Sequence, residues 1–243
     1  MDYDSYVLQL KQNCDSVYKI AEEVRSKGLD PKLTVEIPQA HDLADRTQKL
    51  LEFLHSRNTA EQIRELTVSH DGNRELVALD IGRIAAAETY LYGNTSRCSE
   101  CRGKGFVKVG WREEDCRNCE STGMFIDYDE MPHWKQTLEE FEAVDEYKND
   151  KKIALSIYHG VCAGLAVLTE GILVAPLEGV VSCRLLPNSN GTKCVAISFA
   201  GPIRSAGGTG QALSVLIGDI LRRMFGLGKA QITTKEVERY KEE

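Results

Sequence analysis

The chain has 243 residues, of which 42% are hydrophobic and 28% charged, a composition typical of one large or two small water-soluble domains. No uninterrupted apolar run reaches the roughly 18–20 residues of a membrane span, and the acidic N-terminus lacks the layout of a secretion signal, so we expect a cytoplasmic protein with no membrane partner. The formal net charge of −7 argues against an independent nucleic-acid-binding protein, which normally needs a basic face, so any nucleic-acid contact would require a local patch or a larger assembly.

The first third of the chain is predicted to be mostly helical. Helices are predicted over residues 4–27, 42–55, 59–66 and 74–90, with an extended segment at 33–37. In the first helix, apolar residues recur at spacings of three and four from Tyr3 to Val24, and Gly28 is typical of a helix end. Asn73 follows a turn sequence and suits a cap of the fourth helix. Residues 1–92 are therefore expected to form a helical N-terminal part.

The composition changes after residue 92. Residues 93–125 are rich in glycine, cysteine and charge and form a predicted insert, and residues 126–149 form a predicted acidic linker. Within and after this linker we predict helices at 138–147, 150–169 and 209–225, strands at 172–175, 179–186 and 194–200, and a hairpin loop at 188–191. The predicted fold class is α+β: a helical N-terminal part, a zinc-ribbon-like insert, and a small antiparallel sheet flanked by long helices in residues 150–243.

The end of the sequence carries a last predicted helix. Thr233 and Glu236 have the spacing of a capping box, and no stop signal follows before Glu243. This pattern favours a chain that continues into a longer protein. The alternative is a charged C-terminal helix that frays.

Four of the eight cysteines are clustered, and they are Cys98, Cys101, Cys116 and Cys119. Each CxxC pair places two thiolates at one turn, and two such pairs complete a tetrahedral four-sulfur site that suits structural zinc. Free thiols or an iron–sulfur cluster are the alternatives. Four thiolates leave no coordination position for water, which argues against catalytic zinc. The remaining cysteines lie within apolar patterns and are expected in the core: Cys14, Cys162, Cys183 and Cys194.

Glycines accompany the cysteine pairs. Gly103, Gly105 and Gly123 would let backbone amides approach the sulfurs without a Cβ clash. Residues 106–109 are predicted to form a short strand between the pairs, as in a zinc-ribbon hairpin. The CxxCxGxG pattern also resembles part of the cysteine-rich region of J-domain chaperones, although only two of its four knuckles are present. An independent zinc-containing protein-binding module is therefore the alternative function.

A glycine-rich loop joins the last predicted strand to the following helix at residues 200–210. Consecutive backbone amides at a positive helix end form a generic anion site. The candidate phosphate or nucleic-acid contacts are Arg204, Ser205, Gly207, Gly208 and Thr209. The loop matches neither a Walker sequence nor a dinucleotide fingerprint. A tight connection in which Thr209 only caps the helix is the alternative interpretation.

No catalytic constellation is recognisable in the sequence. The histidines are scattered without metalloprotease spacing, and no nucleophile elbow surrounds Ser205. No close carboxylate pair lies on a predicted strand, as polymerase metal chemistry would need. We therefore assign no catalytic residue to this chain.

Several segments resemble the N-terminal region of the archaeal D-family DNA polymerase large subunit. The glycine loop carries the resemblance, together with motifs upstream and downstream of it. These segments are 201–209 (GPIRSAGGT), 211–216 (QALSVL), 222–223 (RR), 168–171 (LTEG), 175–179 (APLEG), 30–31 (DP), 35–40 (VEIPQA), 42–44 (DLA) and 63–66 (IREL). The resemblance spans nearly the whole chain except the cysteine insert.

The resemblance implies a noncatalytic part of a heterodimeric replicative DNA polymerase. In that family the polymerase centre lies downstream in double-psi β-barrels, whose aspartates bind magnesium, and a smaller subunit carries the 3′–5′ exonuclease. None of those aspartates maps to this sequence. By resemblance, the chain is expected to contribute scaffold, contacts with the small exonuclease subunit, or contacts with primer–template DNA.

Overall fold

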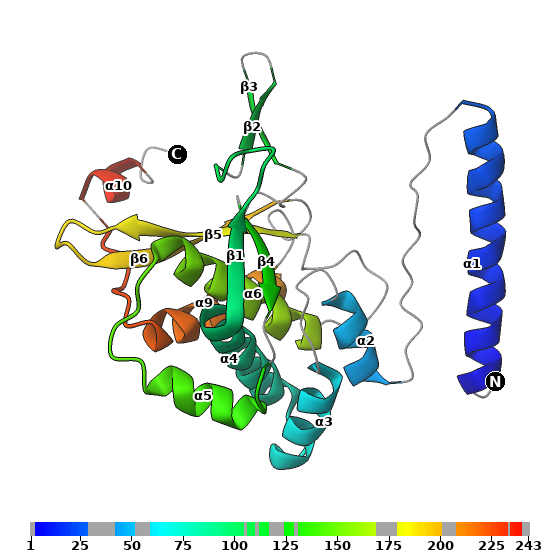
Figure 1. Ribbon diagram of the computed structural model, residues 1–243, viewed down its shortest axis with the longest axis horizontal. Coiled ribbons are helices and arrows are strands. Elements are labelled where there is room, and N and C mark those ends of the chain that lie inside the picture. The colour runs from blue at the N-terminus through cyan, green and yellow to red at the C-terminus, as the bar shows by residue number, and fades with distance from the viewer. Residues whose placement is uncertain are drawn as a thin grey trace.

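The computed structural model describes residues 3–28, 42–51, 59–104, 106–109, 112–116, 124–128, 131–168, 179–200, 208–232 and 234–239. The helices are α1 (Tyr3–Ser26), α2 (Leu43–Leu50), α3 (Thr59–Ser69), α4 (Arg74–Tyr92), α5 (Trp134–Glu142), α6 (Asp150–Leu168), α9 (Gly208–Met224) and α10 (Thr234–Arg239). The strands are β1 (Gly93–Arg97), β2 (Phe106–Val109), β3 (Arg112–Asp115), β4 (Met124–Tyr128), β5 (Val180–Pro187) and β6 (Lys193–Phe199). They form antiparallel pairs β1–β4, β2–β3 and β5–β6, so the α+β prediction is confirmed (Figure 1).

Two long helices, α4 and α6, form the centre of the body. Both are apolar nearly all round, and most of the side chains from Ile153 to Val167 are buried. The helices approach so closely that a Cβ on Gly160 would lie 2.6 Å from the backbone oxygen of Gly82. Similarly, a Cβ on Gly164 would lie 2.9 Å from the backbone oxygen of Ala78. Small residues at these positions therefore set the distance between the two central helices.

Helix α9 and the β5–β6 hairpin cover another side of α6. Ile217 and Leu221 of α9 are buried, and Gly218 lies against the side chain of Ile197 in β6. The hairpin runs from Val180 to Phe199 with a register shift near Ser182. The turn at its tip falls on residues 188–191, as predicted.

An aromatic cluster closes the end of the core near α5. It consists of Tyr90, Phe141, Tyr147 and Phe225, whose rings meet edge-on except for the stacked pair Phe141–Tyr147 at 4.8 Å. Trp134, at the start of α5, also donates a 2.9 Å hydrogen bond from Nε1 to Glu65 of α3. Helix α5 thus begins and ends earlier than the predicted helix at 138–147, because these tertiary contacts, absent from local periodicity, hold its position.

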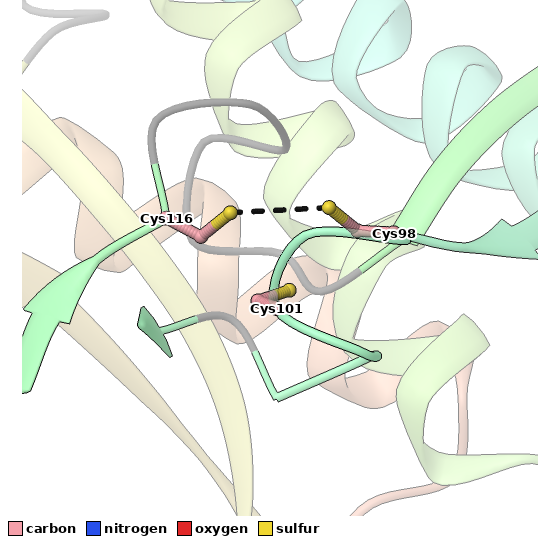
Figure 2. Close-up of side chains that lie close together, drawn as sticks. All are labelled: Cys98, Cys101 and Cys116. Atoms are coloured by element: carbon pink, nitrogen blue, oxygen red, sulfur yellow. Dashed lines mark hydrogen bonds between the residues drawn. The ribbon is translucent and has the colours of Figure 1, made fainter. Parts of the chain in front are cut away.

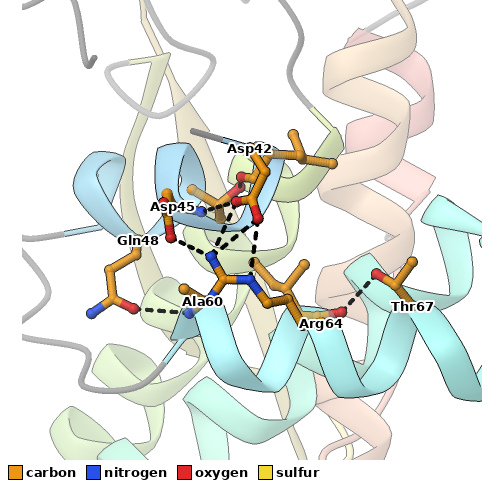
Figure 3. Close-up of polar contacts among 9 residues, drawn as sticks. Asp42, Asp45, Gln48, Ala60, Arg64 and Thr67 are labelled. Atoms are coloured by element: carbon orange, nitrogen blue, oxygen red, sulfur yellow. Dashed lines mark hydrogen bonds and ion pairs between the residues drawn. The ribbon is translucent and has the colours of Figure 1, made fainter. Parts of the chain in front are cut away.

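An ion-pair cluster joins α2 to α3 (Figure 3). Asp42 caps α2 by accepting a hydrogen bond from the Asp45 amide at 2.8 Å, and the guanidinium of Arg64 lies between the Asp42 and Asp45 carboxylates. The amide hydrogen bond, followed by Arg64, lowers the pKa of Asp42. Ala60 adds a 2.8 Å backbone hydrogen bond to the Gln48 side chain. Two segments that carry the family resemblance, 42–44 and 63–66, therefore meet in space.

Helix α1 stands apart from the other elements (Figure 1). It confirms the predicted first helix to within one residue at each end, and Gly28 ends it with φ 77°. Several of its apolar side chains are exposed, including Leu8 and Ile20. The predicted extended segment at 33–37 lies outside the described residues.

Other predicted elements have mixed outcomes. Helix α4 is capped by Asn73 as expected, and α3 extends to Ser69, beyond the predicted end. Helix α9 begins at Gly208, so Thr209 lies inside the first turn and not at the cap position that the alternative interpretation of the loop gives it. The predicted strand at 172–175 and the cap residue Thr233 lie outside the described residues.

Helix α6 is long and apolar enough to span a membrane by length and composition. However, 78% of its most apolar stretch is buried inside the protein, as in the core helix of a soluble domain. The helix therefore gives only weak evidence for a membrane segment.

Candidate functional site

The cysteine insert begins directly after α4 and contains two antiparallel strand pairs. Strands β1 and β4 pair over Gly93–Arg97 and Met124–Tyr128, and the β2–β3 hairpin projects beyond them (Figure 1). The predicted strand at 106–109 is confirmed. Cys98 follows the end of β1 and Cys116 follows the end of β3, so the strand ends bring the first cysteine pair and Cys116 to one place.

Three cysteine thiols converge at this place (Figure 2). The Sγ atoms of Cys98, Cys101 and Cys116 all lie within 4.8 Å of one another, and those of Cys98 and Cys116 are 3.8 Å apart. All three side chains are at most 4% exposed, and none forms a disulfide. Cys119 lies outside the described residues.

The thiol separations suit a shared metal ion. A tetrahedral site with metal–sulfur bonds of about 2.3 Å has sulfur–sulfur edges of about 3.8 Å. The Cys98–Cys116 separation has this length. Among the described residues, the side chain of Val107 packs against the small cysteine core. The group could therefore hold a metal ion that would stabilise an insert with little core of its own.

The turn after Cys101 has the backbone conformation of a tight knuckle. Arg102 and Gly103 both have positive φ, 53° and 81°, and the Lys104 amide donates a 3.1 Å hydrogen bond to the Cys101 carbonyl. Gly103 thus occupies the left-handed region that glycine adopts without strain. Lys151, in the first turn of α6, donates a 3.0 Å hydrogen bond from Nζ to the Gly103 carbonyl. This contact fixes the knuckle against the body.

A buried polar group anchors the other end of the insert. The hydroxyl of Tyr128 lies 3.0 Å from Thr89 Oγ1 and 3.1 Å from His159 Nδ1, and the latter two atoms are 3.0 Å apart. Burial raises the pKa of the Tyr128 phenol well above its ordinary value, so the hydroxyl keeps its proton. The three side chains come from β4, α4 and α6, so the group ties the insert to both central helices.

A buried carboxyl group lies beside this group. Glu88 of α4 is 4% exposed and accepts a 2.8 Å hydrogen bond from Gln62 Nε2 of α3. Burial raises the pKa of Glu88 to about 7 against the opposing effect of the Gln62 hydrogen bond. No motif in the sequence marks these polar residues as a group. An ionisable residue directly after the apolar run Ala85–Ala87 was the available signal.

The glycine loop is described only at its end. Gly208 and Thr209 lie in the first turn of α9, and Gly208 has φ 34°. Arg204, Ser205 and Gly207 lie outside the described residues. Of the other cysteines, Cys162, Cys183 and Cys194 are buried as expected, and burial raises the pKa of Cys183 to about 12, as suits an inert core thiol.

Known proteins match nearly the whole chain. The family model described as DNA polymerase II large subunit DP2, N-terminal, matches residues 5–100 and 136–243. The unmatched residues 101–135 contain Cys101, Cys116 and Cys119.

Similar proteins include three archaeal DNA polymerase II large subunits. The protein from Thermoplasma acidophilum is 34% identical over 242 residues, the one from Picrophilus torridus 36% over 238, and the one from Pyrococcus horikoshii 32% over 244. These alignments cover 98–100% of this chain but only 13–16% of the relatives. The chain therefore belongs to the family formed by the N-terminal region of DNA polymerase II large subunits.

Proposed function

We propose that this chain is the noncatalytic N-terminal part of the large subunit of a replicative D-family DNA polymerase. The observation that carries the proposal is the family match over residues 5–100 and 136–243. In addition, the chain spans only about one seventh of the length of the relatives that it matches. In this proposal the polymerase centre and its magnesium lie elsewhere in the full-length subunit. The chain contributes scaffold and contacts with the small exonuclease subunit or with primer–template DNA.

The buried ionisable groups support a structural role. Among the described residues, Glu88 and His159 are buried and hydrogen-bonded to neutral side chains of the core. Each contributes to packing between helices. Two-metal phosphoryl transfer requires carboxylates that converge on an accessible site. The arrangement favours a scaffold over a nucleotidyl-transfer centre.

A structural zinc ion in the cysteine insert is part of the proposal. Cys98, Cys101 and Cys116 would supply three thiolates, and the CxxC spacing makes Cys119 the fourth. The 3.8 Å separation between the first and third sulfurs supports tetrahedral coordination. When bound, zinc would hold the two cysteine turns of the insert together by neutralising and fixing the thiolates.

Metal analysis tests the zinc site. We expect purified protein to carry about one zinc ion per chain, and Cys116→Ser to lose it and to make the insert sensitive to protease. The matched control is Cys162→Ser on α6, also a buried cysteine, which should retain the zinc. Metal-free wild-type protein with a protease-resistant insert would contradict the assignment. If the purified protein contained iron and sulfide in place of zinc, the site would be an iron–sulfur cluster.

The glycine loop is proposed to contact a phosphate of primer–template DNA. Backbone amides at the start of α9 and the guanidinium of Arg204 would bind it. In the full-length enzyme, Arg204→Ala should weaken primer–template binding and reduce the salt dependence by about one counterion. A helical surface arginine, Arg25, offers a control substitution. Unchanged affinity and salt slope for Arg204→Ala would leave the loop as a structural connection.

The same enzyme tests the function as a whole. We expect residues 1–243 alone not to extend a primer, and a large subunit that lacks them to assemble poorly with the small subunit or to bind primer–template weakly. Extension by the isolated chain would overturn the noncatalytic assignment. A truncated enzyme that assembles, binds and extends normally would instead favour an independent binding module.

A further inference from the structure

A groove of about 680 Å³ lies between the cysteine knuckle and the β5–β6 hairpin. One wall is formed by Gly103, Lys104 and Phe106 of the insert, the floor by the N-terminal half of α6, and the other wall by β5 residues 181–186. Lys151 bridges floor and insert through its 3.0 Å hydrogen bond to the Gly103 carbonyl. The groove is thus built by three parts of the chain that only the tertiary fold brings together.

Within the described part of the chain, β5 is an edge strand. It pairs with β6 on one side, and no strand within the described ranges pairs with its other side. The backbone amides and carbonyls of an unpaired edge are a template for an added strand. Every residue from Val181 to Leu186 lines the groove. An extended polypeptide could therefore lie along β5.

The charge of the groove selects an acidic occupant. Lys104, Lys151 and Arg184 line it, whereas the lining carboxylate, Asp150, is paired with Lys193 at 2.6 Å. This basic lining belongs to a chain whose net charge is −7. The groove also has apolar lining residues, which are Phe106, Leu155, Tyr158 and Leu186. These side chains would contact alternate residues of an added strand. Charge and shape together fit a strand that alternates acidic and apolar residues.

We propose that an extended acidic segment of the remaining large-subunit polypeptide adds to β5 as a strand in this groove. The inference rests on the proposed function, under which this chain is part of a longer subunit. In the relatives, 84–87% of the polypeptide lies outside the region that aligns with this chain. An intramolecular strand also binds at a high effective concentration, which suits a short and exposed edge.

Site-specific photo-crosslinking in the full-length large subunit, assembled with its small subunit, tests this docking. Benzoylphenylalanine at Leu186, a groove residue that is 45% exposed, is expected to crosslink to an acidic segment of the same polypeptide outside residues 1–243. Benzoylphenylalanine at Val68 of α3, which is 81% exposed and away from the groove, is the control and should not crosslink to that segment. The crosslinked peptides are identified by mass spectrometry.

A charge reversal adds a second measurement. Arg184→Glu should weaken docking by about tenfold, the ratio that corresponds to roughly 1.4 kcal/mol, and so reduce the crosslink yield from Leu186. Lys27→Glu on α1, whose side chain is 63% exposed, should leave the yield unchanged.

Three outcomes would overturn the proposal. They are crosslinks to the small subunit, crosslinks to primer–template DNA, and crosslinks confined to residues 1–243. An enzyme that gives one of these results while it still assembles and extends primers leaves the proposed function intact. If an enzyme that lacks residues 1–243 assembles and extends primers normally, that result would instead count against the proposed function itself.

Discussion

Gly160→Ala is expected to lower the free energy of unfolding by about 1–3 kcal/mol, as overpacking of a close-packed core does. An added Cβ would lie 2.6 Å from the Gly82 backbone oxygen, 2.6 Å from Leu221 Cδ1 and 3.1 Å from the Ala86 Cβ. The backbone oxygen and the Ala86 methyl cannot rotate away, so α4 and α6 must separate. The loss outweighs the gain of up to about 1 kcal/mol that alanine usually brings to a helix interior.

Urea denaturation of Gly160→Ala and Gly218→Ala measures this effect. Gly218 is likewise a buried glycine inside a helix, but its added Cβ would meet the Cδ1 atom of Ile197, at 2.6 Å. That atom is the end of a flexible side chain and can rotate, so Gly218→Ala should remain within about 1 kcal/mol of wild type. If the two variants had equal free energies of unfolding, the close approach of α4 and α6 at Gly160 would not be the cause of the destabilisation.

Glu88→Gln is expected to remove a pH dependence of stability worth about 3 kcal/mol. In the folded protein burial raises the pKa of Glu88 to about 7 from an ordinary 4.5. The folded state therefore binds more protons than the unfolded state between these values. The contribution is fully present below pH 4.5 and is lost as the pH rises through 7. Wild-type stability should fall between pH 5 and 8 relative to the glutamine variant, which keeps a neutral side chain of similar shape beside Gln62.

Urea denaturation at pH 5 and pH 8 tests the Glu88 prediction. The quantity to compare is the difference in unfolding free energy between wild type and Glu88→Gln, because contributions from the groups that both proteins share cancel. Glu75→Gln, at an exposed position on the same helix, is the control and should show no such difference. A wild-type curve that runs parallel to that of Glu88→Gln would contradict a protonated buried carboxyl.

The contacts of the insert suggest how it is integrated with the body. Tyr128 ties the β1–β4 ribbon to α4 and α6, and Lys151 holds the knuckle near the start of α6. A metal ion at the cysteines would therefore order one wall of the groove beside β5. The zinc proposal and the docking proposal are coupled through this wall, although their tests are separate.

Local sequence patterns were sufficient for most of the secondary structure. The periodicity of apolar residues located α1, α4, α6 and α9 to within a few residues. The spacing of three and four residues that places side chains on one helix face is visible along the chain without knowledge of distant contacts. The loop residues 188–191 marked the β5–β6 hairpin for the same local reason. The paired CxxC spacing identified the metal candidates, and the longer motifs identified the family, since both are readable along the chain.

Tertiary structure decided the features that depend on distant residues. The position of α5 follows from the packing of Phe141 and Trp134, which outweighed a later helical pattern. The raised pKa of Glu88 exists because Gln62 and the neighbouring helices exclude water. The close approach of Gly82 to Gly160 likewise brings together residues that are neighbours only in the fold. Such properties arise from burial and packing between elements, and local sequence does not encode which elements will meet.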